Sequence, residues 1–224
     1  TAGLDADTVS FETTRGGFGS MALSTTGAAR CVPGWTDGEE LARLFLADPA
    51  PEPATEAGPT EGGTTVNGAL SIPFRLAPGE SRTESFCITW HFPNVERFGH
   101  QGNHYCETFD SALDAARYVT ANLKHLTDRT LLYHQTLYQS NLPEEFLDAM
   151  SSQSVILRGP TCWRSAEGYF GGYEGAYGCC PLNCTHVWNY AQSHARLFPD
   201  IGRNIRISDF ITYLHDDGET SHRQ

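Results

Sequence analysis

The spacing of apolar residues changes near residue 100, and this change restricts the possible folds more than any other feature of the chain. Upstream, apolar residues alternate at a period of two, typical of strands with one buried face: Leu70, Ile72, Phe74 and Leu76, then Phe86, Ile88 and Trp90. From 108 to 140 they recur at steps of three and four without Pro or Gly, which predicts a long helix. Strands followed by helices predict a multi-domain protein, β then α.

Shorter signals predict further elements. A strand is expected over Phe18–Ser24, a turn at Ala77–Glu80, and a helix after Asp37, whose carboxylate suits an N-cap. Three more helices are expected, over residues 143–158, 184–198 and 205–214. Residues 49–65 are Pro, Glu, Gly and Thr with almost no apolar residue, which predicts a surface loop. Because Trp90 alternates with Phe86 and Ile88, we expect it in the core.

Composition excludes several classes of partner. The formal net charge is −12, which opposes binding to nucleic acid or to anionic membranes. No window approaches the ~18 apolar residues of a spanning helix, so no integral membrane segment is expected. The sequence indicates neither a localisation nor an oligomeric state.

The cysteines favour reduced thiols over a disulfide framework. There are seven, an odd number, and four of them lie close together: Cys162, Cys179, Cys180 and Cys184. Secreted disulfide frameworks usually carry an even number in a much shorter chain. We therefore expect mainly buried free thiols that act as small apolar residues.

One segment carries the residues of a carbohydrate site. Tyr173-Glu174-Gly175 stands in a run of glycines flanked by aromatic residues, just before a predicted helix. Glycines let the backbone approach a ligand closely, and tyrosines offer apolar faces with polar edges. A carboxylate in that setting suits a glycosidase nucleophile.

Several pieces in order resemble the catalytic region of glycoside hydrolase family 116, the bile-acid β-glucosidase or non-lysosomal glucosylceramidase family. Tyr173-Glu174-Gly175 falls on the family's nucleophile motif and Asn183–Tyr190 on the helix that follows it. The other matching pieces are Gly102–Cys106, Leu142-Pro143, Thr161–Trp163 and Ala195–Pro199. The resemblance covers about the last 125 residues well and the first 95 loosely.

The resemblance implies a fold. Residues 1–100 would be the C-terminal part of a β-sandwich, and residues 101–224 the first helices of an (α/α)6 barrel. A complete barrel needs on the order of 300 residues. Fewer remain after Thr108, so the chain looks like an internal fragment that is inactive alone.

The resemblance also implies a retaining mechanism on β-glucosides or related β-glycosides, including glycolipids. Glu174 would be the catalytic nucleophile, and an Asp downstream of this chain the acid and base. Tyr173, Asn183, Thr185 and His186 would bind the substrate, and no cofactor is required. His186 stands where the family has an Asp that holds the sugar, after a one-residue insertion, which makes a different sugar or role plausible.

Other acidic residues fit the second carboxylate poorly. Asp200 and Asp209 have no family match, and Glu144, Glu145 and Asp148 are expected on the solvated face of a helix. His215-Asp216 resembles a sugar-binding pair of the family, but the spacing is too short.

Two alternatives remain. Cys179-Cys180-Pro181 resembles a motif of the β-L-arabinofuranosidases of glycoside hydrolase family 127, in which zinc activates a cysteine nucleophile. Glu174, Cys179, Cys180 and Cys184, with Cys162 as a further donor, would then be the metal ligands. The other alternative is a non-catalytic carbohydrate-binding or structural module that uses Trp35 and Trp90.

Overall fold

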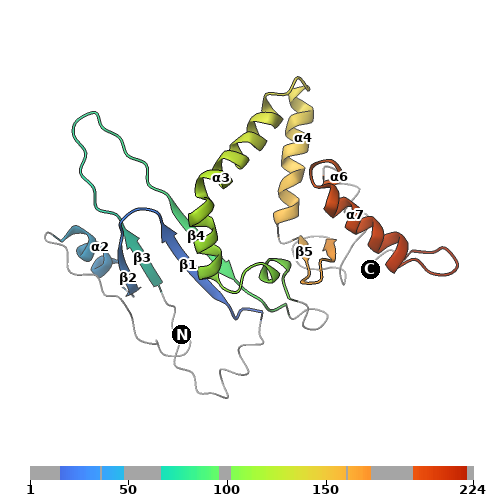
Figure 1. Ribbon diagram of the computed structural model, residues 1–224, viewed down its shortest axis with the longest axis horizontal. Coiled ribbons are helices and arrows are strands. Elements are labelled where there is room, and N and C mark those ends of the chain that lie inside the picture. The colour runs from blue at the N-terminus through green and yellow to red at the C-terminus, as the bar shows by residue number, and fades with distance from the viewer. Residues whose placement is uncertain are drawn as a thin grey trace, which may run out of the picture. The chain divides into compact units, whose positions relative to one another are not determined.

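A computed structural model describes residues 16–35, 37–47, 67–95, 102–159, 161–172 and 194–220 of the chain (Figure 1). The chain divides into two compact units. Unit 1 comprises residues 1–94 with 109–124, and unit 2 comprises residues 95–108 with 125–224. Among the described residues, two small antiparallel sheets come first and most helices follow, with a third two-stranded sheet among them, which is compatible with the predicted order of β then α in this coarse form.

The described residues of unit 1 form two antiparallel strand pairs. β1 (Ser20–Thr25) pairs with β4 (Phe86–His91), and β2 (Arg30–Trp35) pairs with β3 (Asn67–Ser71). The strands predicted at Phe18–Ser24 and around Ile88 are therefore confirmed. The helix predicted after Asp37 is α2 (Gly38–Leu46), and the Asp37 carboxylate accepts a hydrogen bond from the Glu39 N–H at 2.9 Å.

The alternation over residues 70–76 predicts a longer strand than the chain forms. β3 ends at Ser71, and Phe74 and Leu76 are exposed. Pro73 explains this end, because proline has no N–H to give to a sheet. The predicted turn does form: Gly79 has a φ of 83°, and the Glu80 N–H donates to the Ala77 carbonyl at 3.0 Å.

The long helix predicted over residues 108–140 is confirmed as α3 (Ala112–Tyr138). Two serines meet its first N–H groups: Ser111 Oγ accepts from Asp114 N at 3.1 Å, and Ser20 Oγ of β1 accepts from Ala112 N at 3.1 Å. A helix start leaves such groups without helical partners. Strand β1 therefore supplies part of the cap of α3.

The first turns of α3 cover one face of the β1–β4 sheet. Thr89, 9% exposed, donates its hydroxyl to the Ala112 carbonyl at 2.7 Å, and Ala115 and Ala116 are buried beside it. Alanines allow a helix to approach a sheet closely. The covered face consists of small residues, with Ala22 opposite Thr89 and Ser24 opposite Cys87.

The opposite face of this sheet is apolar and exposed, which corrects the prediction that Trp90 is core. Met21 lies opposite Trp90, and Leu23 lies opposite Ile88. Trp90 is 55% exposed and Ile88 60% exposed. Alternation separates the two faces of a strand but does not say which of them α3 covers.

Unit 2 carries the second half of α3 and the remaining described elements. These are the 3₁₀ helix η1 (His104–Glu107), α4 (Glu144–Ser154), the 3₁₀ helix η2 (Val155–Arg158), β5 (Cys162–Arg164), β6 (Phe170–Gly172), α6 (His194–Leu197), α7 (Pro199–Ile207) and the π-helix η3 (Ser208–Thr212). The Tyr138 hydroxyl at the end of α3 donates to Ser151 Oγ of α4 at 2.9 Å. Among the described residues, no helix is long and apolar enough to span a membrane.

Two helix predictions need correction in unit 2. The helix predicted over residues 205–214 begins earlier, at Pro199, because proline at a first helical position has no N–H to leave unpaired. The helix predicted over residues 143–158 is an α-helix only as far as Ser154, and Val155–Arg158 form the 3₁₀ helix η2. Of the helix predicted over residues 184–198, the structure describes the end as α6, and residues 184–193 lie outside the described residues.

Candidate active site

The residues that the sequence singles out lie outside the described residues. Residues 173–193 include Glu174 with Tyr173, Asn183, Thr185 and His186, and the alternative zinc ligands Cys179, Cys180 and Cys184. The structure neither brings them together nor separates them. It does describe the hairpin that leads into this segment and the elements that hold that hairpin.

Strands β5 and β6 form a tight antiparallel hairpin that ends two residues before Glu174 in the sequence. Trp163 pairs with Gly171, and Cys162 pairs with Gly172. Ser165 closes the turn: its N–H donates to the Tyr169 carbonyl at 2.9 Å, and its hydroxyl accepts from the Tyr169 N–H at 3.1 Å. Gly168 has a φ of 93°, which this turn needs and which other residues rarely adopt.

The segment at Gly102–His104 holds the hairpin near its turn. Trp163 Nε1 donates to Asn103 Oδ1 at 3.1 Å, and the Ala166 N–H donates to the Gly102 carbonyl at 3.3 Å. His104 Nδ1 donates to the Ala166 carbonyl at 3.1 Å. Two pieces of the family resemblance, 102–106 and 161–163, are thus in direct contact although about 60 residues separate them.

Helix α7 holds the other end of the hairpin. Phe170, 4% exposed, packs with the fully buried Ile205, and Leu157, Cys162 and Ile201 pack around them. The Phe170 N–H donates to the Asn204 side-chain oxygen at 3.0 Å. Asn204 was not predicted from the sequence, in which it is only an amide residue within a short amphipathic helix.

Cys162 lies in this apolar cluster as a free thiol. Burial raises its pKa from the ordinary 9.0 to about 11, although a contact with Thr161 works in the opposite direction. The four described cysteines are free thiols, as expected, but the expectation of burial is met only in part: Cys31 is exposed, and Cys87, Cys106 and Cys162 are half-buried. Within the described part of the chain, no three metal-ligating side chains gather.

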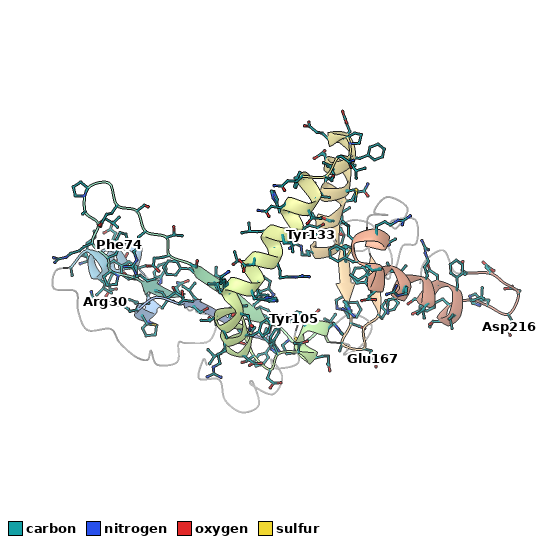
Figure 2. The ribbon with its side chains drawn as sticks, turned by 45° about the horizontal axis from the view of Figure 1, so that its top comes forward. Arg30, Phe74, Tyr105, Tyr133, Glu167 and Asp216 are labelled. Carbon is teal, nitrogen blue, oxygen red and sulfur yellow. The ribbon has the colours of Figure 1, made fainter. Side chains whose placement is uncertain are left out.

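The acidic residues considered as a second carboxylate are exposed, with the exception of Asp209. Glu144, Glu145 and Asp148 are exposed on α4, as predicted. Asp209 is 5% exposed and accepts a hydrogen bond from Arg206 at 3.1 Å, whereas Asp200 pairs with Arg203 at the surface. Figure 2 shows Asp216 at the tip of the C-terminal loop, away from Glu167 at the hairpin turn, and both His215 and Asp216 are exposed.

The comparison with protein families identifies the chain. A family model described as beta-glucosidase 2, glycosyl-hydrolase family 116 N-term, matches residues 14–126. The chain belongs to glycosyl-hydrolase family 116. The match ends two residues beyond unit 1, whose last segment ends at Lys124. No curated protein and no solved structure matches the chain.

The matched range bears on the family and not on the individual site residues. It covers β1 to β4 and the first half of α3. Glu174 and the other candidate residues lie downstream of it. Membership supports a glycoside hydrolase with a carbohydrate substrate, and the finer assignments are proposals.

Proposed function

We propose that this chain is part of a retaining glycoside hydrolase that cleaves β-glucosides or related β-glycosides, in the manner of glucosylceramidases. Membership of family 116 supports this proposal most directly. The β5–β6 hairpin adds to it, because a strand with three buried residues runs into Tyr173-Glu174-Gly175.

In the proposed mechanism, Glu174 attacks the anomeric carbon while a second carboxylic acid protonates the departing oxygen. The resulting glycosyl-enzyme is then hydrolysed by a water molecule that the second carboxylate deprotonates. Such pairs lie roughly 5 to 5.5 Å apart. We assign the second group to no residue of this chain. Tyr173, Asn183, Thr185 and His186 would hold the sugar.

The finer fold is also a proposal. We assign unit 1 to the C-terminal part of a β-sandwich and the helices that follow to the start of an (α/α)6 barrel. The exposed face of β1–β4 supports the sandwich, because Met21, Leu23, Ile88 and Trp90 form an apolar surface of the kind that a second sheet covers. This explanation of the Trp90 side chain needs no carbohydrate-binding module.

The test is a comparison of two carboxamide variants in the full-length gene product. Glu174→Gln should lower kcat on an aryl β-glucoside by roughly 10³-fold or more, because no covalent intermediate can form. Glu167→Gln is the control: this carboxylate is exposed in the hairpin turn, seven residues earlier, and its loss should leave kcat within twofold. Equal activity of both variants would refute the nucleophile assignment.

Labelling with a 2-fluoro glycoside and peptide mapping tests the same point directly. We expect the label on Glu174. Label on Cys179 or Cys180 would favour the zinc-dependent thiol mechanism, whose ligand set would be Glu174 and the cysteines at 179, 180 and 184. Metal content separates the two chemistries as well: we expect well under one zinc per chain and activity that survives chelation.

A further inference from the structure

One side of α7, of the π-helix η3 and of the residues just after them is apolar and exposed. Four side chains form this surface, which we call the α7 face, and they are exposed by 52%, 57%, 73% and 44% in the order Ile207, Phe210, Ile211 and Leu214. Steps of three, one and three residues separate them, which is the spacing of a single helix face. The other side of α7 and η3 is used within unit 2, where Ile205 and Ser208 are buried.

The end of the α7 face that comes first in the sequence is basic. The side chains of Arg203 and Arg206 are 67% and 56% exposed. Each pairs with a carboxylate of its own helix, Arg203 with Asp200 and Arg206 with Asp209. A guanidinium has five N–H donors, so each arginine can bind a second carboxylate beside the first.

The other end of the α7 face is acidic. The loop after η3 carries the exposed residues Asp216, Asp217 and Glu219, and Figure 2 shows Asp216 at its tip. The loop has a defined shape, because the His215 N–H donates to the Glu219 carbonyl at 2.9 Å and the Glu219 N–H donates to Asp217 Oδ1 at 3.0 Å. The negative charge therefore has a fixed place beyond Leu214.

This order of charges complements its own reverse. A two-fold axis near Phe210 would lay the α7 faces of two copies against each other with the helices antiparallel. Phe210 stands seven residues after Arg203 and six before Asp216, so the basic end of each copy would meet the acidic loop of the other. A parallel pair would bring like charges together at both ends. Two-fold contacts that use the same patch on both copies are the commonest form of oligomer.

We propose that the α7 face is the contact of a homodimer, in which α7 of two copies packs antiparallel and Arg203 of each copy approaches Asp216 of the other. Four partly exposed side chains offer less than the roughly 800 Å² per partner of a stable interface. The dimer is therefore reversible, with a Kd on the order of 10–100 µM. This inference goes beyond the proposed function and does not depend on Glu174.

Sedimentation equilibrium of the full-length gene product tests the proposal. We expect wild type to pass from monomer to dimer between roughly 1 and 300 µM. Ile211→Glu places a carboxylate within the contact and should raise the Kd about 30-fold or more. Phe146→Glu is the matched control, because it adds the same charge at another exposed apolar position of unit 2, 64% exposed on α4, and should leave the Kd within about twofold.

Exchanged charges test the antiparallel arrangement. Arg203→Glu alone and Asp216→Arg alone should each raise the Kd about 5- to 10-fold, because like charges then meet between the copies. The variant with both substitutions should return the Kd to within about threefold of wild type, since the pair is restored with its signs reversed.

Several results would overturn the proposal. One is a wild type that stays monomeric over the whole range; if Ile211→Glu also lowers its thermal unfolding temperature by several degrees, another segment of the same gene product covers the α7 face. A dimer that Ile211→Glu leaves intact, or single charge variants that the double variant does not rescue, would overturn it as well. The measurement uses no substrate, so its outcome is independent of the activity of Glu174→Gln.

Discussion

Replacing Ile205 by alanine should loosen the β5–β6 hairpin. Ile205 is 0% exposed and is the largest fully buried side chain among the described residues. It packs on Phe170, with Leu157, Cys162 and Ile201 around the pair. The substitution removes three carbons from a site with few other buried residues to fill the space.

The magnitude follows from the lost apolar contact and the cavity left behind. Burial of each methylene contributes about 0.8 kcal/mol, which gives about 2.4 kcal/mol for three carbons. The cavity adds to this loss, and such changes usually cost about 2–5 kcal/mol in all. Alanine regains a few tenths of a kcal/mol as a better helix former. We expect a net loss of about 3 kcal/mol in the local free energy of unfolding.

The assay is amide hydrogen exchange of the full-length protein at residues 170–172 under conditions where exchange reports the opening equilibrium. A loss of about 3 kcal/mol corresponds to roughly 100-fold faster exchange, because each 1.4 kcal/mol is tenfold. Ile207→Ala is the control, since Ile207 lies two residues along the same helix and is 52% exposed. It should accelerate exchange less than fivefold, or about 1 kcal/mol. Equal effects of the two substitutions would refute the packing argument.

Three further outcomes are expected. Gly202→Ala should lower the thermal unfolding temperature although alanine improves helix propensity by about 1 kcal/mol, because the new Cβ would lie 3.1 Å from Ala195 Cα. The control is Gly38→Ala in α2, whose Cβ meets nothing within 4 Å and which should be neutral or stabilising. The pKa of Cys162 is raised to about 11, so its thiol should react with iodoacetamide at pH 8 roughly 100-fold more slowly in the folded protein than in urea. The contribution of Cys162 to folding stability should fall as pH rises from 9 towards 11, because the thiol loses its proton at a lower pH in the unfolded chain than in the folded protein. Ser20→Ala should lower the free energy of unfolding of unit 1 by about 1 kcal/mol in urea titrations, because it removes a cap of α3, and no change would show that the cap is dispensable.

The sequence predicts a helix or strand well where the pattern that indicates it lies within the element itself. The 3.6-residue period predicts α3, the carboxylate of Asp37 predicts the start of α2, and alternation predicts β4. Each depends on residues within a few positions of one another, and backbone geometry translates such spacing directly into a helix or strand.

The sequence predicts less about the candidate site than about the helices and strands. The motif around Glu174 and the resemblance to family 116 come from the order of residues, and the family match confirms the family. The role of Glu174 stays a prediction. The contact of Asn204 with Phe170 could not have been found in this way, because it joins residues 34 positions apart and leaves no period in the sequence.

Only the tertiary structure decides which surface of each element is covered. Trp90 and Ile88 have the alternation of core residues, yet α3 packs on the opposite face, where Thr89 meets Ala112. Gly102–His104 and Trp163 are separate in the sequence and meet at the hairpin. The sequence by itself determined the family, the motif that nominates Glu174, and the elements with a strong local signal such as α2, α3 and β4, because these follow from local spacing and order. The covered faces and the hydrogen bonds that hold the hairpin were decided by contacts between distant segments, which no local pattern encodes.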